Sequence, residues 1–280
     1  MNYRHVYHAG NFADVIKHVV LMGLIAGLSK KLTPWCYLDT HAGSGYYDFT
    51  STQALKTKEY QNGIEKIIQA DHPPPLVRAY LDCIHAINNE LSNTTFSSLQ
   101  YYPGSPLIVR RLLRPTDRLV ACELQQDEYQ GLHHLFAGDK QAGIHHMDGF
   151  LGLKAFLPPK EHRGLVLIDP PYEQIDEFTH IINALSIALK RWSSGIYAIW
   201  YPIKEKAALS PFYRSLKKLS NNVLLVEVNI YPEISHHLTG CGLAIINPPW
   251  EFDQLMINSV PWLWKSLAHQ SQGNYRVEYL

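Results

Sequence analysis

Short runs of apolar residues alternate with longer amphipathic segments along most of the second half of this chain. The short runs are bounded by glycine or charged residues, as buried strands are, and the segments between them carry apolar residues at helical spacing. The pattern predicts strands at 117–123, 142–148, 164–170 and 195–201, separated by helices at 127–136, 149–157 and 175–192. Such alternation is typical of a parallel sheet with helices on both faces.

The two ends of the chain add to this sheet. Upstream, WCYLD (Trp35–Asp39) predicts its first strand. Downstream, the apolar runs at 221–230 and 240–249 are joined by a loop too short for a crossover helix, so they should pair antiparallel. We therefore expect an α/β, Rossmann-like fold with a mostly parallel seven-stranded sheet and an antiparallel terminal hairpin.

The segment between residues 50 and 99 does not follow the alternation of strands and helices. It has helical periodicity and a Pro-Pro-Pro break at 73–75, and no strand pattern. This predicts a main domain formed by residues 1–49 and 100–280 and an inserted helical subdomain over 50–99.

Composition narrows the class of protein only a little. The 25 basic and 25 acidic residues cancel, so any nucleic-acid surface must be a local patch. The scattered cysteines do not form a Cys-x-x-Cys pair, which argues against a disulfide framework and a cysteine zinc site. Since there is no signal-like start and no apolar run near the ~20 residues that cross a bilayer, we expect a cytoplasmic protein without a membrane partner.

Four consecutive predicted strands end in an acid: Asp39, Glu123, Asp148 and Asp169. Each alone is equally consistent with a solvated strand end, and the Gly43-x-Gly45 turn after Asp39 with an ordinary strand-to-helix connection. Together they should line one edge of the sheet, where ligands bind in such folds. A carboxylate-rich edge with a glycine turn but no Gly-x-Gly-x-x-Gly suits S-adenosylmethionine better than a nicotinamide cofactor or ATP.

The stretch LVLIDPPYEQ (165–174) carries the sharpest chemical signal. Two prolines after Asp169 make the loop stiff and leave Tyr172 at its tip. Asp-Pro-Pro-Tyr resembles the signature of amino-methyltransferases acting on adenine N6. There, the carboxylate of Asp169 and the carbonyl of Pro170 would accept the two amino hydrogens, turning the nitrogen lone pair toward the methyl donor, while Tyr172 stacks on a base held outside its helix.

The resemblance extends to one family. The segments MNYRHVYHAGNFADVIKHVVL, LDTHAGSG, YYPGSPLIVRRLL, DGF, LIDPPYE, GIYAIWYP and INPPW are similar, in this order, to the bacterial RlmJ-type adenine-N6 methyltransferases of 23S ribosomal RNA. The resemblance implies a monomer that uses S-adenosyl-L-methionine without a metal. It also implies cofactor contacts from Lys17, His18, His41, Gly43, Ser105, Glu123, Asp148, Gly149 and Asp169. The active site would comprise Asp169, Pro170, Tyr172, Tyr3, His5 and Lys17.

The N-terminal residues 2–5 should act as a substrate gate rather than as a strand. They place two aromatic rings and a cation within three residues, so they can contact a nucleotide, yet they have little to bury by themselves. Chain ends without buried contacts are usually mobile, and we expect this one to order over the pocket when RNA and cofactor bind.

Several features have a structural interpretation beside the functional one. NPPW (247–250) mimics the Asp-Pro-Pro-Tyr motif, but no cofactor loop precedes it, and we expect Asn247 and Trp250 to act through stability. No acid lies at metal-ligand spacing from His5, His8 and His18, which favours turn histidines. The cations Arg110, Arg111 and Arg114 are equally consistent with a phosphate-binding helix face and a solvated charge run.

Two rival functions remain open at this point. A DNA adenine-N6 methyltransferase would share the Asp-Pro-Pro-Tyr chemistry, although the chain shows no separate basic DNA-recognition module. An RNA-binding or assembly module without catalysis would share the fold, although the intact motif and glycine turn speak against it.

Overall fold

The computed structural model describes residues 4–92, 99–174, 176–204, 206–232 and 238–280. The strands of its main sheet are β1 (Cys36–Asp39), β4 (Arg118–Glu123), β5 (Ala142–His146), β6 (Gly164–Ile168), β7 (Ile196–Ile203), β8 (Val223–Asn229), β9 (Gly240–Ile246) and β10 (Asn274–Tyr279). The helices are α1 (Phe12–Ser29), α2 (Thr52–Thr57), α3 (Ile64–Ile68), α4 (Pro75–Ser92), α5 (Ser105–Leu112), α6 (Gln126–Leu135), α7 (Gly149–Phe156), α8 (Glu177–Arg191), α9 (Lys206–Leu219) and α10 (Phe252–Leu267). Short 3-10 helices span His5–Tyr7, Glu59–Asn62 and His269–Ser271, and β2 (Tyr46–Asp48) pairs with β3 (Tyr101–Pro103).

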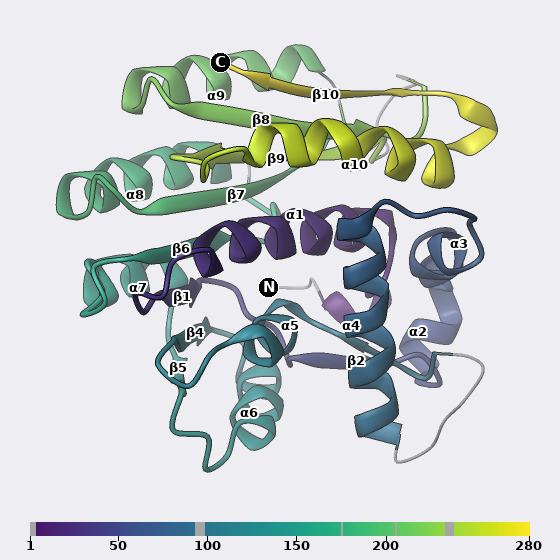
Figure 1. Cartoon of the computed structure of the whole chain (residues 1–280), viewed down its shortest axis with the longest axis horizontal. Coiled ribbons are helices and arrows are strands. Elements are labelled where there is room, and N and C mark those ends of the chain that lie inside the picture. The colour runs from purple at the N-terminus through teal and green to yellow at the C-terminus, as the bar shows by residue number, and fades with distance from the viewer. Residues whose placement is uncertain (1–3, 93–98, 175, 205, 233–237) are drawn as a thin grey trace.

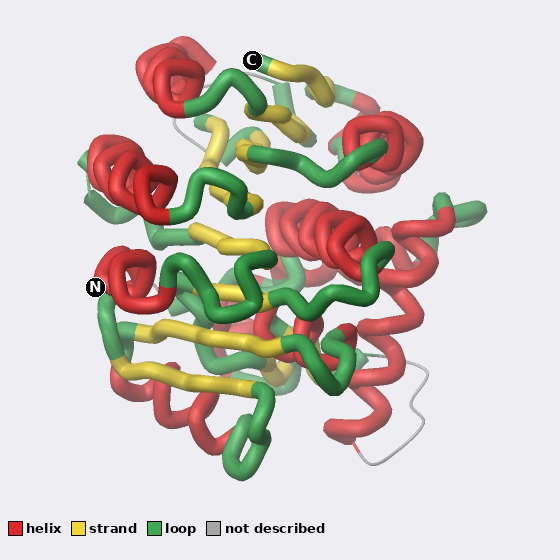
Figure 2. Tube along the Cα trace, turned by 60° about the vertical axis from the view of Figure 1, so that its left-hand side comes forward, coloured by secondary structure: helices red, strands yellow, loops and turns green. Residues whose placement is uncertain are grey.

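The main sheet has the strand order β10-β8-β9-β7-β6-β1-β4-β5. Figure 1 shows α1 and α10 crossing in front of it, and Figure 2 shows the strands as a layer with helices on either side. The position of β6 inside the sheet explains why its sequence is apolar throughout. Leu165 and Leu167 pack into the core beside α1 and α10, whereas Val166 and Ile168 pack beside α7, α8 and α9, so both faces of the strand are buried.

Strand direction separates the two edges of the sheet. Strands β1, β4, β5, β6 and β7 run parallel, so their carboxyl ends share one edge. Strand β9 runs antiparallel to β7, with Ile246 opposite Tyr197. The residues after β9 therefore lie at the opposite edge from the residues after β6.

The predicted α/β fold is confirmed, and so is the antiparallel pairing of the two late strands as β8 and β9. The described part of the chain has eight strands in the sheet rather than the expected seven. The additional strand, β10, pairs antiparallel with β8 at the edge. Its sequence, NYRVEY, has no apolar run because both of its faces are largely exposed or half-buried.

The segment over 50–99 is helical where it is described, through α2, the 3-10 helix at Glu59–Asn62, α3 and α4. Its Tyr60, Ile64, Val77 and Tyr80 are buried in the same hydrophobic cluster as the residues of α1. The division into a main domain and an inserted subdomain remains a prediction.

Helix α1 is apolar on all sides, as a fully buried helix must be. Asn11 caps it by accepting hydrogen bonds from the backbone N–H groups of Ala13 and Asp14. By length and composition alone it is long and apolar enough to cross a membrane, contrary to the expectation that the chain lacks such a run, yet most of it is buried inside the protein. The same helix places Asp14, Lys17 and His18 beside the carboxyl ends of the parallel strands.

Candidate active site

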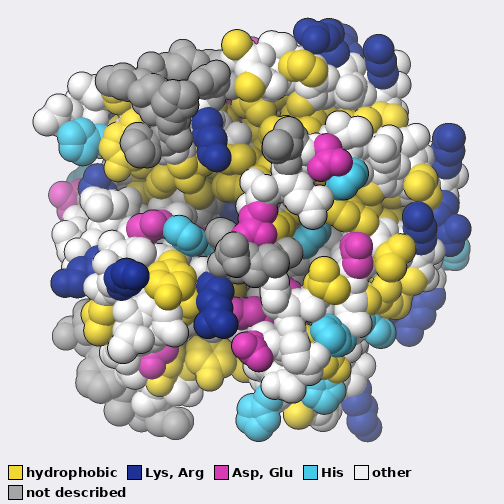
Figure 3. All heavy atoms as spheres, turned by 180° about the vertical axis from the view of Figure 1, so that it is seen from behind, with side chains coloured by type: hydrophobic (Ala, Val, Ile, Leu, Met, Phe, Trp, Pro, Cys, Tyr) yellow, Lys and Arg dark blue, Asp and Glu magenta, His cyan; other side chains and the backbone are white. Residues whose placement is uncertain are grey.

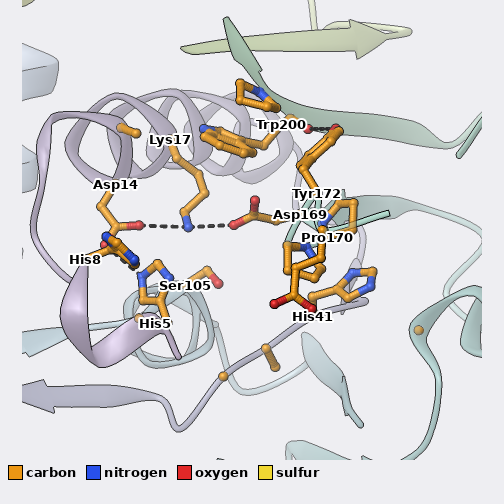
Figure 4. A pocket seen from close by; sticks show the side chains of 18 of the residues that line it. His5, His8, Asp14, Lys17, His41, Ser105, Asp169, Pro170, Tyr172 and Trp200 are labelled. Atoms are coloured by element: carbon orange, nitrogen blue, oxygen red, sulfur yellow. Dashed lines mark hydrogen bonds and ion pairs between the residues drawn. The ribbon is translucent and has the colours of Figure 1, made fainter. Parts of the chain in front are cut away.

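A cavity of about 810 Å³ opens at the carboxyl ends of the parallel strands. Among the described residues, all those predicted for the site line it: His5, Lys17, His18, His41, Gly43, Ser105, Glu123, Asp148, Gly149, Asp169, Pro170 and Tyr172. Tyr3 lies outside the described residues. Figure 4 shows Asp169, Pro170 and Tyr172 on one side of this cavity and His5 and Asp14 on the other.

Asp169 directly follows the buried strand β6 and contacts the only cation close to it in the described part of the chain. The Lys17 Nζ donates to Asp169 Oδ2 at 2.6 Å. Burial opposes a charge on Lys17, but the carboxylates of Asp14 and Asp169 outweigh it and raise the pKa of Lys17 well above its usual value. Asp169 Oδ1 has no hydrogen-bond partner among the described residues, so one carboxylate oxygen remains available to a ligand.

The tip of this loop is held by Tyr172, whose backbone adopts the left-handed conformation at φ 53°. Its hydroxyl donates to the Trp200 carbonyl oxygen, and its ring contacts Trp200 edge to face and Phe178 at a tilt. Burial raises the pKa of Tyr172 well above its usual value. Because the hydroxyl is committed to the backbone, only the ring is left to face a ligand.

The N-terminal tail is anchored more firmly than its composition suggested. His5 Nε2 lies 2.9 Å from Asp14 Oδ2, and the His5 ring lies 5.0 Å from that of Tyr47. The expectation that the tail has no buried contacts of its own is therefore wrong at His5. Its action as a gate remains a prediction.

Glu123 ends β4 and is almost fully buried. Its Oε2 accepts from the Gly43 N–H at 2.8 Å and its Oε1 from the Gln125 N–H at 2.7 Å. Burial raises the pKa of Glu123 in spite of these two donors. Glu123 lines the cavity, where its carboxylate can accept a further hydrogen bond from a ribose hydroxyl.

The loop after β1 needs its two glycines. Gly43 and Gly45 have φ values of 63° and 88°, a region that other residues enter only with strain. A Cβ on Gly43 would also lie 2.3 Å from the Tyr47 hydroxyl. The turn that brings the Gly43 N–H to Glu123 is therefore specified locally by the sequence.

Asp148 and His41 form the neighbouring wall. Asp148 caps α7 by accepting from the Phe150 N–H at 2.7 Å. A Cβ on Gly149 would lie 1.9 Å from the Thr40 carbonyl oxygen, so only glycine allows α7 to begin this close to the loop after β1. Burial lowers the pKa of His41 to about 4, which keeps the imidazole neutral at pH 7.

Asp39 does not join the other strand-end acids in the cavity, contrary to the prediction. It is fully buried and accepts from the hydroxyls of Tyr37 and Ser105, each at 2.7 Å. Burial raises the pKa of Asp39 even with these donors. Its role is to orient Ser105, which itself lines the cavity.

His18 is a buried, neutral histidine that lines the cavity. Its Nδ1 is bonded to the Tyr102 hydroxyl at 2.8 Å, but the buried Nε2 has no hydrogen-bond partner among the described residues. Burial, with the nearby Lys17 charge, lowers the pKa of His18 to about 3. A neutral ring with an unsatisfied nitrogen beside the cavity fits a site that awaits a polar group.

The second proline loop, NPPW, lies away from this cavity. Asn247 has φ 56° and donates through Nδ2 to the carbonyls of Ser193 and Gly195. Pro249 packs on Gly27 of α1. Trp250 is 85% exposed, which argues against the expectation that it acts through stability, whereas Asn247 has the expected structural contacts.

Asp14 and Trp200 are among the cavity residues that the sequence analysis did not name. Asp14 is buried within an apolar helix, and Trp200 lies in β7 with its indole above the Lys17–Asp169 pair in Figure 4. A pair of opposite charges three residues apart in an otherwise apolar helix is a signal that would have identified Asp14 with Lys17. In the described ranges, no group of three or more His, Cys, Asp or Glu side chains is arranged to hold a metal ion.

Comparison with known proteins agrees with this geometry. Residues 32–280 match the family described as "RsmJ: Ribosomal RNA large subunit methyltransferase D, RlmJ". The chain is 39% identical to the ribosomal RNA large subunit methyltransferase J of Escherichia coli K12 and 37% identical to that of Haemophilus influenzae, over all of this chain and 99% of each relative. The crystal structure of protein LPL1258 from Legionella pneumophila superposes with a TM-score of 0.86 at 37% identity, covering 97% of this chain and 98% of the other.

Fold, site geometry and full-length similarity point the same way. The chain belongs to the RlmJ family of ribosomal RNA large subunit methyltransferases.

Proposed function

We propose that this protein transfers a methyl group from S-adenosyl-L-methionine to the exocyclic N6 of one adenosine in 23S ribosomal RNA. The observation that carries the proposal is the arrangement around Asp169, where a carboxylate with one free oxygen, a proline carbonyl and two aromatic rings meet in one cavity. The names of the E. coli and H. influenzae relatives support a large-subunit ribosomal RNA substrate.

The adenine amino group needs two acceptors, because its lone pair is delocalised into the ring. Asp169 Oδ1 accepts one amino hydrogen and the carbonyl of Pro170 accepts the other. The nitrogen then becomes tetrahedral, and its lone pair turns out of the base plane toward the methyl donor. Positioning of this kind supplies a large part of the rate enhancement in a displacement reaction.

The base has to leave its stack to reach Asp169. The ring of Tyr172, held at its hydroxyl by Trp200, offers a flat face for it, and the Trp200 indole adds a second apolar wall. Stacking is worth about 1–3 kcal/mol per base, which offsets part of the cost of extruding the nucleotide.

The other wall of the cavity fits the cofactor. Glu123 would accept hydrogen bonds from a ribose diol, Asp148 and the Gly149 backbone would lie along the adenine moiety, and His18 Nε2 would meet the amino-acid end. When bound, S-adenosyl-L-methionine supplies an electrophilic methyl on a sulfonium. The carboxylates nearby suit a ligand with one positive charge and no phosphate.

Two rival functions are distinguishable. Nothing in the Asp169 chemistry excludes DNA, but the similarity to ribosomal RNA enzymes covers the entire chain, which favours RNA. A silent binding module does not require a free oxygen on Asp169 or a buried Lys17 beside it. A monomeric, cytoplasmic enzyme with an inserted subdomain over 50–99 completes the proposal.

The test is a nucleoside map of ribosomal RNA from a strain that lacks this gene. The account predicts that one N6-methyladenosine of large-subunit RNA disappears, returns with the wild-type gene and does not return with Asp169→Ala. An unchanged map in the deletion strain would contradict the proposed substrate.

A further inference from the structure

Helix α1 contains an acid to which the proposed reaction assigns no role. Asp14 is 3% exposed and lies two turns or less from Lys17 and His18, the other polar side chains in the apolar helix. A buried carboxylate is costly unless it is fully bonded. The hydrogen bonds and the ion pair of Asp14 therefore indicate its role.

Asp14 joins three separate parts of the site. Oδ2 accepts from the Gly10 N–H at 2.9 Å and lies 2.9 Å from His5 Nε2 in the tail, and Oδ1 lies 2.9 Å from Lys17 Nζ. Figure 4 shows Lys17 in line between Asp14 and Asp169. One ammonium group is thus shared by two carboxylates.

The neighbouring charges keep both Asp14 and Lys17 ionised. Burial would neutralise Asp14, but His5 and Lys17 outweigh it and hold the pKa of Asp14 well below its usual value. Asp14 is thus ionised throughout the range in which a methyltransferase works, and Lys17 is charged.

We propose that Asp14 is a positioning residue that confines Lys17 to one oxygen of Asp169. Lys17 then occupies only Oδ2 of Asp169, and Oδ1 remains free for the substrate amino group. The same carboxylate holds His5 at the cavity wall. The inference rests on the proposed function, because it assigns Asp169 the role of amino-group acceptor.

The mechanism makes a directional prediction. Without the charge of Asp14, Lys17 has a single carboxylate partner and can contact both oxygens of Asp169, where it competes with the amino hydrogens. The turnover number should fall, while cofactor affinity should change much less, because Glu123, Asp148 and Gly149 would hold the cofactor from the other wall.

The test variant is Asp14→Asn, which keeps the size of the side chain and an oxygen for the Gly10 N–H. We expect kcat to fall about 10- to 100-fold, the range found when a residue that orients an active-site group is lost, and S-adenosylmethionine affinity to change much less. Lys17→Met should also lower kcat, and Asp14→Asn added to it should lower kcat no further, because Asp14 acts through Lys17.

The matched control is Asp117→Asn. Asp117 is as deeply buried and is paired with Arg114, before the start of β4 at the far edge of the sheet. It should lower the melting temperature without changing kcat at a temperature where the protein is folded.

A wild-type kcat in folded Asp14→Asn, or kcat losses that multiply in the double variant, would overturn the inference. If Asp14→Asn does not fold, Asp14→Ser replaces it, since that variant also removes the charge but keeps a polar oxygen, and a wild-type kcat there would overturn the inference equally. Absence of methyl transfer by the wild-type protein would instead refute the proposed function.

A different observation concerns the distribution of charge. Helices α8 and α9 carry six cations and a single acid, Glu177, which is buried. The six cations are Lys190, Arg191, Lys206, Arg214, Lys217 and Lys218. Lys and Arg side chains gather accordingly along the right-hand side of Figure 3, over the region in which α8 and α9 lie. In a chain without net charge, these helices carry a local excess of positive charge, as RNA binding requires.

The exposed cations of α9 differ from those of α5. Each arginine from the α5 region has a carboxylate partner: Arg110 with Asp139, Arg111 with Glu90 and Arg114 with Asp117. These ion pairs favour the structural interpretation of that cluster, and phosphate binding by it stays a prediction. On α9, by contrast, Arg214, Lys217 and Lys218 lie on one exposed face, three and four residues apart, and none has a carboxylate within 4.0 Å in the described ranges.

This α9 stripe (Arg214, Lys217 and Lys218) lies in the second half of α9, about 15–20 Å along the helix from Lys204, which precedes α9 and lines the cavity. The geometry points to the α9 stripe as a binding surface for the phosphate backbone of the substrate RNA, outside the methylated nucleotide. Cations that contact phosphates position a nucleic acid and make its binding salt-dependent. This inference also rests on the proposed function.

The test variant reverses the charge of the α9 stripe by combining Arg214→Glu, Lys217→Glu and Lys218→Glu. We expect KM for a long ribosomal RNA fragment to rise at least tenfold, its salt dependence to flatten and kcat to stay unchanged. Arg78→Glu, Lys140→Glu and Lys265→Glu together are the control, since these exposed cations are scattered and give the same net charge. An equal rise in KM in both triple variants, or in neither, would overturn the inference, whereas an inactive wild type would refute the proposed function.

Discussion

Two loops of this protein have nearly the same sequence pattern and opposite surroundings. Asp169-Pro-Pro-Tyr172 follows β6, and Asn247-Pro-Pro-Trp250 follows β9. The first lies in the cavity, where Asp169 contacts Lys17 and Tyr172 contacts Trp200. The second lies at the other edge, where Asn247 is bonded to the turn before β7 and Trp250 projects into solvent.

The difference arises from strand direction rather than from the motif. Strand β6 runs parallel to β1 and β7, so its end meets the glycine turn and the cofactor wall. Strand β9 runs antiparallel to β7, so its end cannot reach that edge. A polar residue followed by Pro-Pro and an aromatic ring is therefore catalytic only when topology delivers it to the ligand.

The largest expected effect is that of Asp169→Ala. Removing the acceptor should lower methyl transfer by on the order of 10³-fold or more, the loss found when one preorganised group of this kind is removed. Lys17 retains Asp14, so the fold should survive. A methyl-transfer assay together with a melting curve checks this, and normal turnover would remove the loop from the mechanism.

Tyr172 should show a smaller and graded effect. Tyr172→Ala loses the stacking face, worth about 1–3 kcal/mol, so kcat/KM should fall roughly 5- to 150-fold. Tyr172→Phe keeps the ring but loses the bond to the Trp200 carbonyl, about 1 kcal/mol. Its activity should lie between that of Tyr172→Ala and wild type. Equal losses in the two variants would show that the hydroxyl, not the ring, matters.

Asn247→Ala should affect stability rather than chemistry. It removes two side-chain hydrogen bonds and places alanine at φ 56°, which together cost about 2 kcal/mol. The melting temperature should fall by about 4–8 °C. Turnover at low temperature should stay near normal, and Asn247→Gly, which tolerates the backbone, should be intermediate in stability. An inactive but fully stable Asn247→Ala protein would make the second loop catalytic.

The smallest effect should come from Trp250→Ala. Because the side chain is 85% exposed, its loss should change the free energy of unfolding by no more than about 0.5 kcal/mol. Methyl transfer should also remain unchanged. The difference in activity between Tyr172→Ala and Trp250→Ala measures how much an aromatic ring contributes when it lies in the cavity. A loss of activity in Trp250→Ala would instead indicate a substrate contact at the opposite edge of the sheet.

The sequence predicted the alternating fold because each parallel strand is buried on both faces and so carries an unbroken apolar run. It failed at β10, where an exposed edge strand needs no such run. It placed Glu123, Asp148 and Asp169 correctly at one edge but could not foresee that Asp39 turns inward to Ser105, since that depends on contacts between distant segments. The same holds for Asp14, whose contact with His5 and whose link to Asp169 through Lys17 form only in the folded chain.

One measurement tests the central claim most directly. Purified wild-type protein is incubated with a large-subunit ribosomal RNA transcript and S-adenosylmethionine carrying a deuterated methyl group. For mass spectrometry, one portion of the RNA is digested to nucleosides and another to oligonucleotides. The account predicts that the label appears as N6-methyladenosine at a single position. Label on a ring carbon of adenine, on a ribose oxygen or on another base would contradict it.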